Sequence, residues 1–269
     1  MKVLRFVSLL VILFAFAINA YADSILASAE AFGILGASTV TNTGPSVVFQ
    51  DLGLWPGTSI TGFPPGVVLG TIHNSDGVAM QAQADALTGY NYLAGLAMTQ
   101  DLTGQDLGGL TLNAGVYFFA SSAQMTGTLT LDFQGMDNML VVFQIGSTLT
   151  AGGAVNVINA GMNDRVYWQV GSSATLDTTT DFVGSIIALE SITMNTGADI
   201  TCGRAIALNG AVTMDTNSVD TGNCASTPEP GTLSLLGSGI VAAGASAWPA
   251  AFPGFGLAGL AGLRRRMRR

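Results

Sequence analysis

The sequence predicts a mostly β protein, a β-solenoid with one long α-helix packed beside it. A short pattern of alternating residues recurs five times between Val116 and Val219. The copies align on Met125, Leu149, Leu176, Met194 and Met214, in steps of 24, 27, 18 and 20 residues. Short strands separated by Gly, Ser and Asn corners at such a period are typical of stacked coils, which bury a core that one coil cannot bury alone.

The periodicity changes between Asp76 and about Thr99, and this change predicts the helix. Apolar residues at Met80, Ala84, Leu87, Tyr90 and Ala94 recur every three or four positions. Ser75 or Asp76 precedes them as an N-cap. We expect a helix over about 76–99 whose alanine-rich face packs along the side of the solenoid, rather than a separate domain.

The segments around the helix also fit this fold. Residues 44–70 are rich in Gly and Pro and predict an ordered loop with short strands that covers one end of the stack. In the five coils we expect one inward-pointing column of large side chains, which contribute to the core rather than to a sugar platform: Phe118, Phe143, Trp168, Ile187 and Ile206.

Both ends of the chain are typical of targeting segments. Residues 1–22 contain Lys2 and Arg5, an apolar run and Ala20-Tyr21-Ala22, as a secretory signal peptide with its cleavage site does. The run is short for a membrane anchor. Residues 228–269 contain Pro228-Glu229-Pro230, a long apolar stretch and a terminal arginine cluster. This order predicts a membrane segment with its basic end in the cytoplasm, and leaves 23–227 as the folded domain.

The tail resembles the PEP-CTERM sorting signal of Gram-negative bacteria. The resemblance covers the last 42 residues. It implies export, a transient C-terminal anchor, and processing by an exosortase-type sorting protease near Pro228, Glu229 and Pro230. Pro249 and Pro253 depart from the usual pattern because they interrupt an unusually long apolar segment. We therefore expect a protein that is located at the cell surface or outer membrane, or released outside the cell.

Charge and reactive residues exclude several functions. Between Asp23 and Pro230 there are two arginines against 17 acids, a net charge of −15, which disfavours nucleic acid as a partner. His73 is the only histidine, so we expect a structural role for it, no metal site, no cofactor and no enzymatic activity. Cys202 and Cys224 are expected to form one disulfide in an exported protein; a metal site is the alternative, but it lacks a nearby histidine.

Small hydroxyl residues gather at the predicted coil corners and suggest a binding surface. Stacked coils would place them in a regular array about 4.7–4.9 Å apart, and threonine is stiff about χ1. Such a rigid surface can order water as an ice plane requires, although threonine is also simply favoured on strand surfaces. The residues are Thr126, Thr128, Thr150, Thr178, Thr180, Thr196, Thr216 and Ser218.

Longer blocks closely resemble the microbial ice-binding (antifreeze) protein family. They include Gly62-Phe-Pro-Pro-Gly, Asp101-Leu-Thr-Gly-Gln-Asp-Leu-Gly-Gly-Leu, Val142-Phe-Gln-Ile-Gly-Ser and Trp168-Gln-Val-Gly-Ser-Ser-Ala-Thr-Leu. The resemblance implies a discontinuous, three-faced solenoid with one side helix, and ice binding through one flat face without catalysis. The family's Thr-Ala/Gly-x-Thr/Asn motif falls on Thr43–Ser46, which adds Thr43 and Ser46 to the expected surface, and on Thr150–Gly153 and Thr196–Asp199. Its fourth position is Ser, Gly or Asp here, which predicts modest ice affinity.

Two hypotheses follow from these observations. The first is an exported, monomeric protein that adsorbs to ice and limits its growth or recrystallisation. The alternative is a cell-surface or biofilm-matrix scaffold or adhesin that binds exopolysaccharide.

Overall fold

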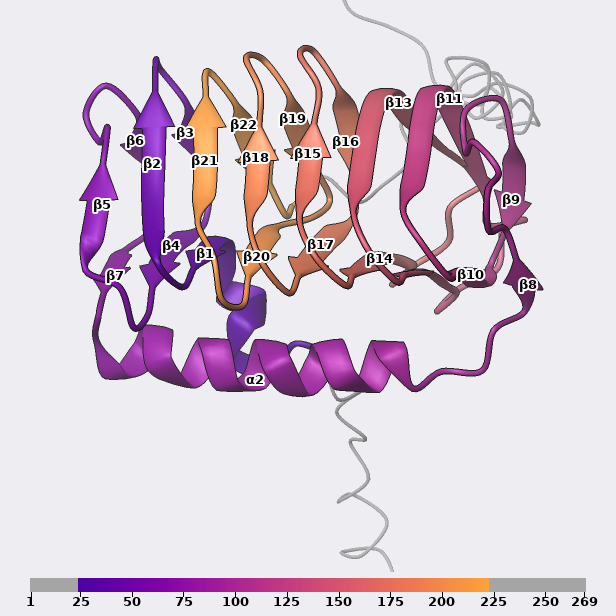
Figure 1. Ribbon diagram of the computed structural model, residues 1–269, viewed down its shortest axis with the longest axis horizontal. Helices are drawn as coiled ribbons and strands as arrows, with labels where there is room; N and C mark the ends of the chain where they lie inside the picture. Colours follow the sequence, from indigo (N-terminus) through magenta and orange to yellow (C-terminus); the bar gives the residue numbers. More distant parts are fainter. Residues whose placement is uncertain (1–23, 223–269) are drawn as a thin grey trace, which may run out of the picture. The chain divides into compact units, whose positions relative to one another are not determined.

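The computed structural model describes residues 24–222, which form coils of parallel strands with one long helix alongside (Figure 1). Every strand pair in it is parallel, and the strands form two hydrogen-bonded sheets, of nine and 13 strands, that run the length of the molecule. We divide the 13-stranded sheet at the middle of its two longest strands and so describe three ladders of strands. The predicted mostly β fold with a single long helix is thereby confirmed. The predictions for residues 1–22, for residues 228–269 and for Cys224 lie outside the described residues.

Ladder 1 is the sheet that faces the helix. Its strands, in spatial order, are β7 (Ile72–Asn74), β4 (Asp51–Leu54), β1 (Phe32–Gly36), β20 (Ala205–Ala207), β17 (Ser185–Ala188), β14 (Arg165–Val170), β12 (Leu140–Ile145), β10 (Gly115–Phe119) and β8 (Gln100–Asp101). Both surfaces of this sheet are covered, so strands such as β14 are apolar almost throughout and buried at nearly every position.

Ladders 2 and 3 share two long strands, β11 (Ala123–Asp132) and β13 (Leu149–Ile158), whose first halves lie in ladder 2 and second halves in ladder 3. Ladder 2 continues through β15 (Ala174–Leu176), β18 (Ile192–Met194), β21 (Val212–Asp215), β2 (Thr39–Thr43) and β5 (Ser59–Thr61). Ladder 3 comprises β9 (Thr111–Asn113), β16 (Asp181–Val183), β19 (Asp199–Thr201), β22 (Ser218–Asp220), β3 (Val47–Val48) and β6 (Val67–Val68).

The chain does not wind from one end to the other. It begins at β1, in the middle of ladder 1, and builds two coils outward through β7. The helix then carries it to the opposite end, where β8 begins the return, and the last strands β21 and β22 pair with β2 and β3. The Gly- and Pro-rich segment 44–70, predicted to be an ordered loop with short strands at one end of the stack, supplies the short coil strands β3 to β6, of which β5 and β6 are end strands of their sheet.

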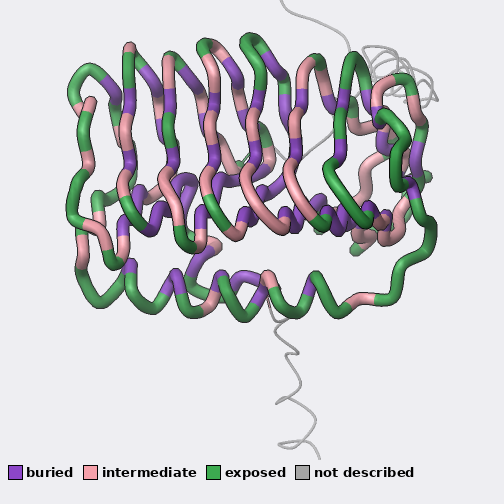
Figure 2. The backbone as a smooth tube through the Cα atoms, viewed as in Figure 1, coloured by how far each residue is buried: buried purple, intermediate pink, exposed green. Residues whose placement is uncertain are grey.

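The helix α2 (Gly77–Ala94) packs on ladder 1 through small residues. Asp76 caps it by accepting hydrogen bonds from the backbone N–H groups of Val78 and Ala79. Ala79, Ala82, Ala86 and Gly89 are among its buried residues, which lie on the side facing the coils (Figure 2). A Cβ atom at Gly89 would lie 2.5 Å from the carbonyl oxygen of Ile25 in the segment before the 3₁₀ helix η1 (Ala27–Ala31).

The prediction that the alanine-rich face packs along the coils is confirmed, because small residues let the helix approach its neighbour closely. Met80 and Leu87, two of the apolar residues whose spacing predicted the helix, are each 46% exposed. The predicted C-terminal bound was wrong, because the helix ends at Ala94 rather than at about Thr99.

The core lies inside the coils and contains a column of aromatic rings. Tyr117 stacks on Phe143 at 5.5 Å, Phe143 on Trp168 at 3.9 Å, and Trp168 lies 4.8 Å from Phe182, measured between ring centroids. The predicted column is correct at Phe143 and Trp168 and wrong elsewhere. Phe118 pairs with Gln144 on the other side of the strand, and both Ile187 and Ile206 pack in the second apolar cluster, beneath the helix.

Candidate functional site

One row of threonines follows the outer side of ladder 2. The paired positions are Thr61 with Thr41, Thr41 with Thr213, Thr213 with Thr193, Thr193 with Thr175, and Thr175 with Thr150. We call these six residues the threonine row. It crosses six neighbouring coils, and Gln124 continues it on β11. The N-terminal strands β2 and β5 contribute Thr41 and Thr61. These two residues join the row because β2 pairs with β21 and β5 pairs with β2.

Strand alternation explains why these six hydroxyls point outward. In each strand the residue before the threonine is an apolar residue directed to the interior, such as Val40, Val212 or Ile192. Because successive side chains of a strand lie on opposite sides, burying the apolar residue exposes the threonine. Thr61 and Thr213 are exposed and the other four are half-buried by their neighbours in the row.

A second row of small hydroxyl residues lies two residues earlier in each strand or in the turn before it. It comprises Ser59, Thr39, Ser191, Ser173, Thr148 and Ser122, with Ala211 as an interruption. Thr148 Oγ1 donates to Ser122 Oγ at 2.8 Å, and Ser191 Oγ accepts from the backbone N–H of Ala211 at 3.1 Å. With strands about 4.8 Å apart and alternate residues about 6.7 Å apart, the two rows form a rectangular grid.

One edge of this surface carries the carboxylates of Asp106 and Asp215, next to the corner where ladder 2 meets ladder 3. We call this edge the carboxylate margin. Thr126 Oγ1 donates to Asp106 Oδ2 at 2.5 Å, and Thr196 Oγ1 donates to Asp215 Oδ2 at 2.5 Å. Partial burial raises the pKa of Asp106, but hydrogen bonds from Thr126 and Gly108 outweigh that effect, so its pKa lies below the usual value. These threonine hydroxyls are therefore held in fixed orientations.

The structure separates the ten residues expected from the sequence into five groups. Thr150 belongs to the threonine row, and Thr43 and Thr126 lie on the carboxylate margin beside it. The corner between ladders 2 and 3 holds Thr178, Thr196 and Thr216, all exposed. On ladder 3 lie Thr128 and Ser218, which pair with Ala154 and Val47.

The remaining two predicted residues, Ser46 and Thr180, are corrections, because both are 0% exposed. Ser46 Oγ accepts the backbone N–H of Asn217 at 2.9 Å, and Thr180 Oγ1 donates to the carbonyl oxygen of Ala151 at 3.1 Å. Their hydroxyls satisfy buried backbone groups at the corner and cannot touch an external surface.

Sequence reasoning missed five of the six residues in the threonine row. A signal for them exists in the repeated pattern of a hydroxyl residue, an apolar residue and a threonine. It occurs at Ser59-Ile-Thr61, Thr39-Val-Thr41, Ser173-Ala-Thr175, Ser191-Ile-Thr193 and Thr148-Leu-Thr150. Alternation places both hydroxyl residues of each triplet on the outer side.

The other two ladders do not offer a comparable surface. Ladder 1 is covered by α2 and η1. The outer side of ladder 3 changes character along its length, with Asp181 paired to Asp199 near its middle and Val47 paired to Val67 at one end. Ladder 2 alone among the described ladders presents the same side-chain type at the same position in six consecutive coils.

The described residues lack an arrangement suited to metal chemistry. Among residues 24–222, no group of three or more His, Cys, Asp or Glu side chains is placed to hold a metal ion. His73 Nδ1 lies 2.8 Å from Asp76 Oδ2, the N-cap of α2, and the imidazole packs edge-on against Phe32. This matches the structural role expected for it. Within the same residues, no helix has the length and apolar character needed to cross a membrane.

Comparison with known proteins identifies the class. The family model described as Ice-binding-like matches residues 34–220, and the chain belongs to this family. An ice-binding protein of Nostoc sp. (strain HG1) is 57% identical over 226 residues, which cover 81% of this chain and 84% of the relative.

Solved structures agree with this assignment. The crystal structure of an ice binding protein from an Antarctic biological consortium has a TM-score of 0.69 and 45% identity, covering 72% of this chain and 89% of its own. An ice-binding protein from the Antarctic ascomycete Antarctomyces psychrotrophicus has a TM-score of 0.66 and 39% identity, covering 72% and 96%.

Proposed function

We propose that this protein binds ice through the threonine row and its flanking hydroxyl row on ladder 2. The observation that carries the proposal is the register: six threonines in six consecutive coils are direct strand partners. Threonine combines a methyl group with a hydroxyl and has few χ1 rotamers. A grid of such residues can order water molecules in two dimensions, as attachment to a crystal plane requires.

We infer that the three ladders are the three faces of the solenoid, and that the face of ladder 2 is the flat one. Support comes from the unbroken pairing of ladder 2 and from the cover over ladder 1. The carboxylate margin, with Asp215 paired to Thr43, bounds the grid on one side. A carboxylate orders water differently from a threonine, so the grid available to ice ends at this margin.

The test compares two threonines of one coil in the full-length protein. Thr193→Tyr places a ring in the middle of the threonine row, whereas Thr201→Tyr places the same ring on ladder 3. We expect Thr193→Tyr to remove most of the thermal hysteresis, the inhibition of ice recrystallisation and the partitioning into growing ice. Thr201→Tyr should retain all three.

The opposite pattern, or equal activity in the two variants, would reject ladder 2 as the binding surface. Thr196→Ala tests the corner residues separately, and we expect it to lower thermal hysteresis only partly, because its hydroxyl is already bonded to Asp215. Circular dichroism of each variant checks that the coils are intact.

The location of the protein is also a proposal. Residues 1–22 and 228–269 support export, followed by cleavage near Pro228–Pro230 by an exosortase-type protease and a position at the cell surface or outside the cell. Mass spectrometry of the protein from its host would show a mature chain that begins at Asp23 and ends near residue 228. Both intact termini in the exported protein would contradict it.

A further inference from the structure

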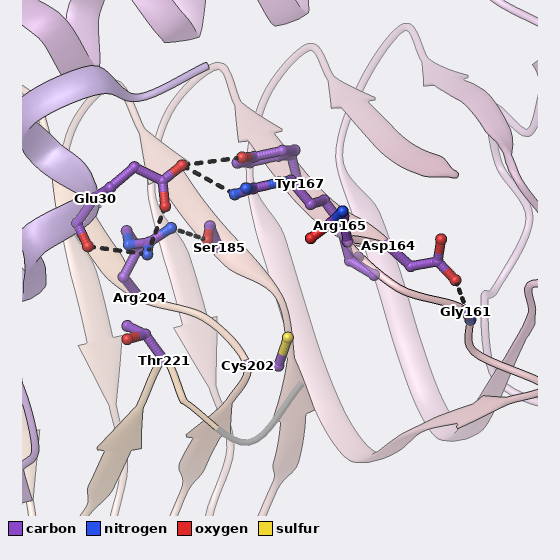
Figure 3. A pocket seen from close by; sticks show the side chains of 11 residues that line it. Glu30, Gly161, Asp164, Arg165, Tyr167, Ser185, Cys202, Arg204 and Thr221 are labelled. Atoms are coloured by element: carbon purple, nitrogen blue, oxygen red, sulfur yellow. Dashed lines mark hydrogen bonds and ion pairs between the residues drawn. The ribbon is translucent and has the colours of Figure 1, made fainter. Parts of the chain in front are cut away.

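A pocket of about 270 Å³ opens at the corner between ladders 3 and 1. Its walls come from η1, from the loop before β14, from the first residues of β14 and β17, and from Arg204 just before β20 (Figure 3). Glu30, Asn163, Arg165, Tyr167, Arg204 and Thr221 are among the residues that line it. None of them belongs to ladder 2.

The pocket exists because neighbouring coils turn this corner differently. Between β13 and β14 the chain makes a loop over residues 159–164. In the next coil only Gly184 separates β16 from β17. A Cβ atom at Gly184 would lie 2.7 Å from the carbonyl oxygen of Val166, which shows how closely that corner follows its neighbour. The step from a long loop to a tight corner leaves the space below the loop open.

The pocket contains every lysine or arginine side chain of the described residues. Residues 24–222 contain 15 acidic residues, and Arg165 and Arg204 are their only lysine or arginine side chains. Both line this pocket. An anion approaching the described surface can therefore find an arginine partner only here, in a pocket that Glu30 and Asp164 also line, whereas the remaining acidic surface repels it.

The two arginines have different roles. Arg204 is 6% exposed and fully engaged: it donates to the carbonyl oxygens of Phe32 and Glu30 and to Ser185 Oγ, and it pairs with Glu30 Oε2 at 3.0 Å. Arg165 keeps 44% of its side chain exposed and directs Nη1 to Glu30 Oε1 at 3.2 Å. Arg204 thus builds the floor, and Arg165 presents a guanidinium at the opening.

The acidic residue on the loop does not compete for Arg165. Asp164 Oδ2 accepts the backbone N–H of Gly161 at 2.7 Å, and its Oδ1 accepts that of Met139 at 2.8 Å. Both carboxylate oxygens therefore serve the loop backbone. The planar guanidinium of Arg165 remains suited to a carboxylate, which it can bind through two parallel hydrogen bonds.

We propose that this pocket binds the carboxylate of a sugar acid, such as a uronate residue, with Arg165 as its main contact. Glu30 and Asp164 line the same pocket, so a singly charged carboxylate meets less repulsion there than a phosphate dianion would, and it matches the single exposed guanidinium. The amide of Asn163 can donate and accept, as the hydroxyl groups of a sugar require. The uronate can come from a free sugar acid or from an acidic polysaccharide.

The position of the pocket allows ice and saccharide to be bound together. The corner of ladders 3 and 1 is the corner that ladder 2 does not touch, so a ligand there leaves the threonine row free. This consequence rests on the proposed ice face, but uronate binding does not. Simultaneous binding would link ice to an acidic polysaccharide layer.

The test is calorimetric titration of the full-length protein with galacturonate, with neutral galactose and with an oligogalacturonate. We expect saturable binding of galacturonate, at least tenfold weaker binding of galactose, and binding of the oligomer at the same site. Arg165→Gln should weaken galacturonate binding at least tenfold, and Arg165→Lys should weaken it less because the charge remains. Asn163→Ala should weaken it severalfold, whereas Asn156→Ala, on the outer side of β13, should not.

Three outcomes would overturn the proposal. Equal affinities for galacturonate and galactose would show that the carboxylate does not contribute to binding. Binding of the oligomer but not of the monomer would place the contact on the repeated surface instead of the pocket. Unchanged affinity for galacturonate in a folded Arg165→Gln variant would show that Arg165 is not the main contact. Recrystallisation inhibition with saturating galacturonate should be unchanged, and this measurement separates a failed ice face from a failed pocket.

Discussion

Gln144 joins the helix to the coils, and replacing it measures how firmly the two are held together. Its side chain lies on the helix side of β12 and is 6% exposed. Nε2 donates to the carbonyl oxygens of Leu93 and Leu96, at 2.8 Å in each case. The last carbonyls of a helix have no partner within the helix itself. A strand residue therefore completes the hydrogen bonding at the end of α2.

The expected loss in the free energy of unfolding follows from the two hydrogen bonds that Gln144→Leu removes. The variant keeps a similar volume but leaves two carbonyl groups without this donor. Leu93 is fully buried, and its carbonyl oxygen would keep only the long 3.4 Å hydrogen bond from the backbone N–H of Leu96; weakening the hydrogen bonding of a buried acceptor in this way costs about 1–3 kcal/mol. Leu96 is half-buried, so water can replace the lost donor there. We expect the free energy of unfolding to fall by about 2 kcal/mol and the Tm by about 4–8 °C.

Urea and thermal unfolding followed by circular dichroism would measure this change, with Gln124→Leu on the exposed side of β11 as the matched control. The control should lie within about 0.5 kcal/mol of the parent. Hydrogen exchange should accelerate at the C-terminal end of α2 in Gln144→Leu. Equal stability of Gln144→Leu and the parent would refute the view that these two hydrogen bonds hold the helix.

Gln144→Glu adds a second test with a defined pH dependence. The introduced carboxyl group faces two carbonyl oxygens at the negative end of the helix dipole, so its pKa in the folded state should be raised. Its protonated form fits the site better than its ionised form. Relative to Gln144→Leu, the variant should lose stability as the pH rises above the ordinary pKa of glutamate. A constant difference between the two variants across the acid range would contradict the assigned contacts.

Two further predictions concern the core and the acidic residues. Trp168→Ala should cost about 3–5 kcal/mol because it breaks the stack on Phe143, whereas Trp168→Phe should cost less and mainly leave the carbonyl oxygen of Val183 without its donor; equal losses in denaturant titrations would argue against the ring stack. Hydrogen bonds from Ser28 hold the pKa of Asp85 below its usual value of 3.8, and those from Asn159 and the Gln134 backbone do the same for Asp132. A lowered folded-state pKa stabilises the protein fully above about pH 3.8 and stops doing so as the pH falls through the lower value, so the Tm should decrease below about pH 4; a Tm that stays constant down to pH 2 would contradict this.

The contact surfaces of the strands and the helix could be predicted only in part from the sequence. The repeats indicate coils, but their alignment predicts Phe118 in the interior column, where Tyr117 lies instead. A shift of one residue moves a side chain to the other side of a strand. Ladder 1 is apolar on both sides, so alternation cannot reveal which residues face the core and which face α2.

The candidate site, too, could be predicted only in part from the sequence. The sequence favoured threonines at corners, and the corner includes Thr180, whose hydroxyl is buried in a backbone hydrogen bond. The threonine row instead lies within the strands of ladder 2, where each threonine follows an inward apolar side chain by one residue. Thr41 and Thr213 are 172 positions apart in sequence, and their proximity depends on the pairing of β2 with β21. No local pattern contains that pairing.

By itself the sequence determined the class of fold, the presence and start of the helix, the acidic character of the domain and its family, because these depend on composition, period and local motifs. Tertiary structure decided which threonines form one surface, which strand residues face the helix, and where the two arginines meet. These features depend on register between coils and on a chain path that begins in the middle of the stack. Such pairings arise from contacts between residues distant in sequence, and they are fixed only when the complete stack of coils forms.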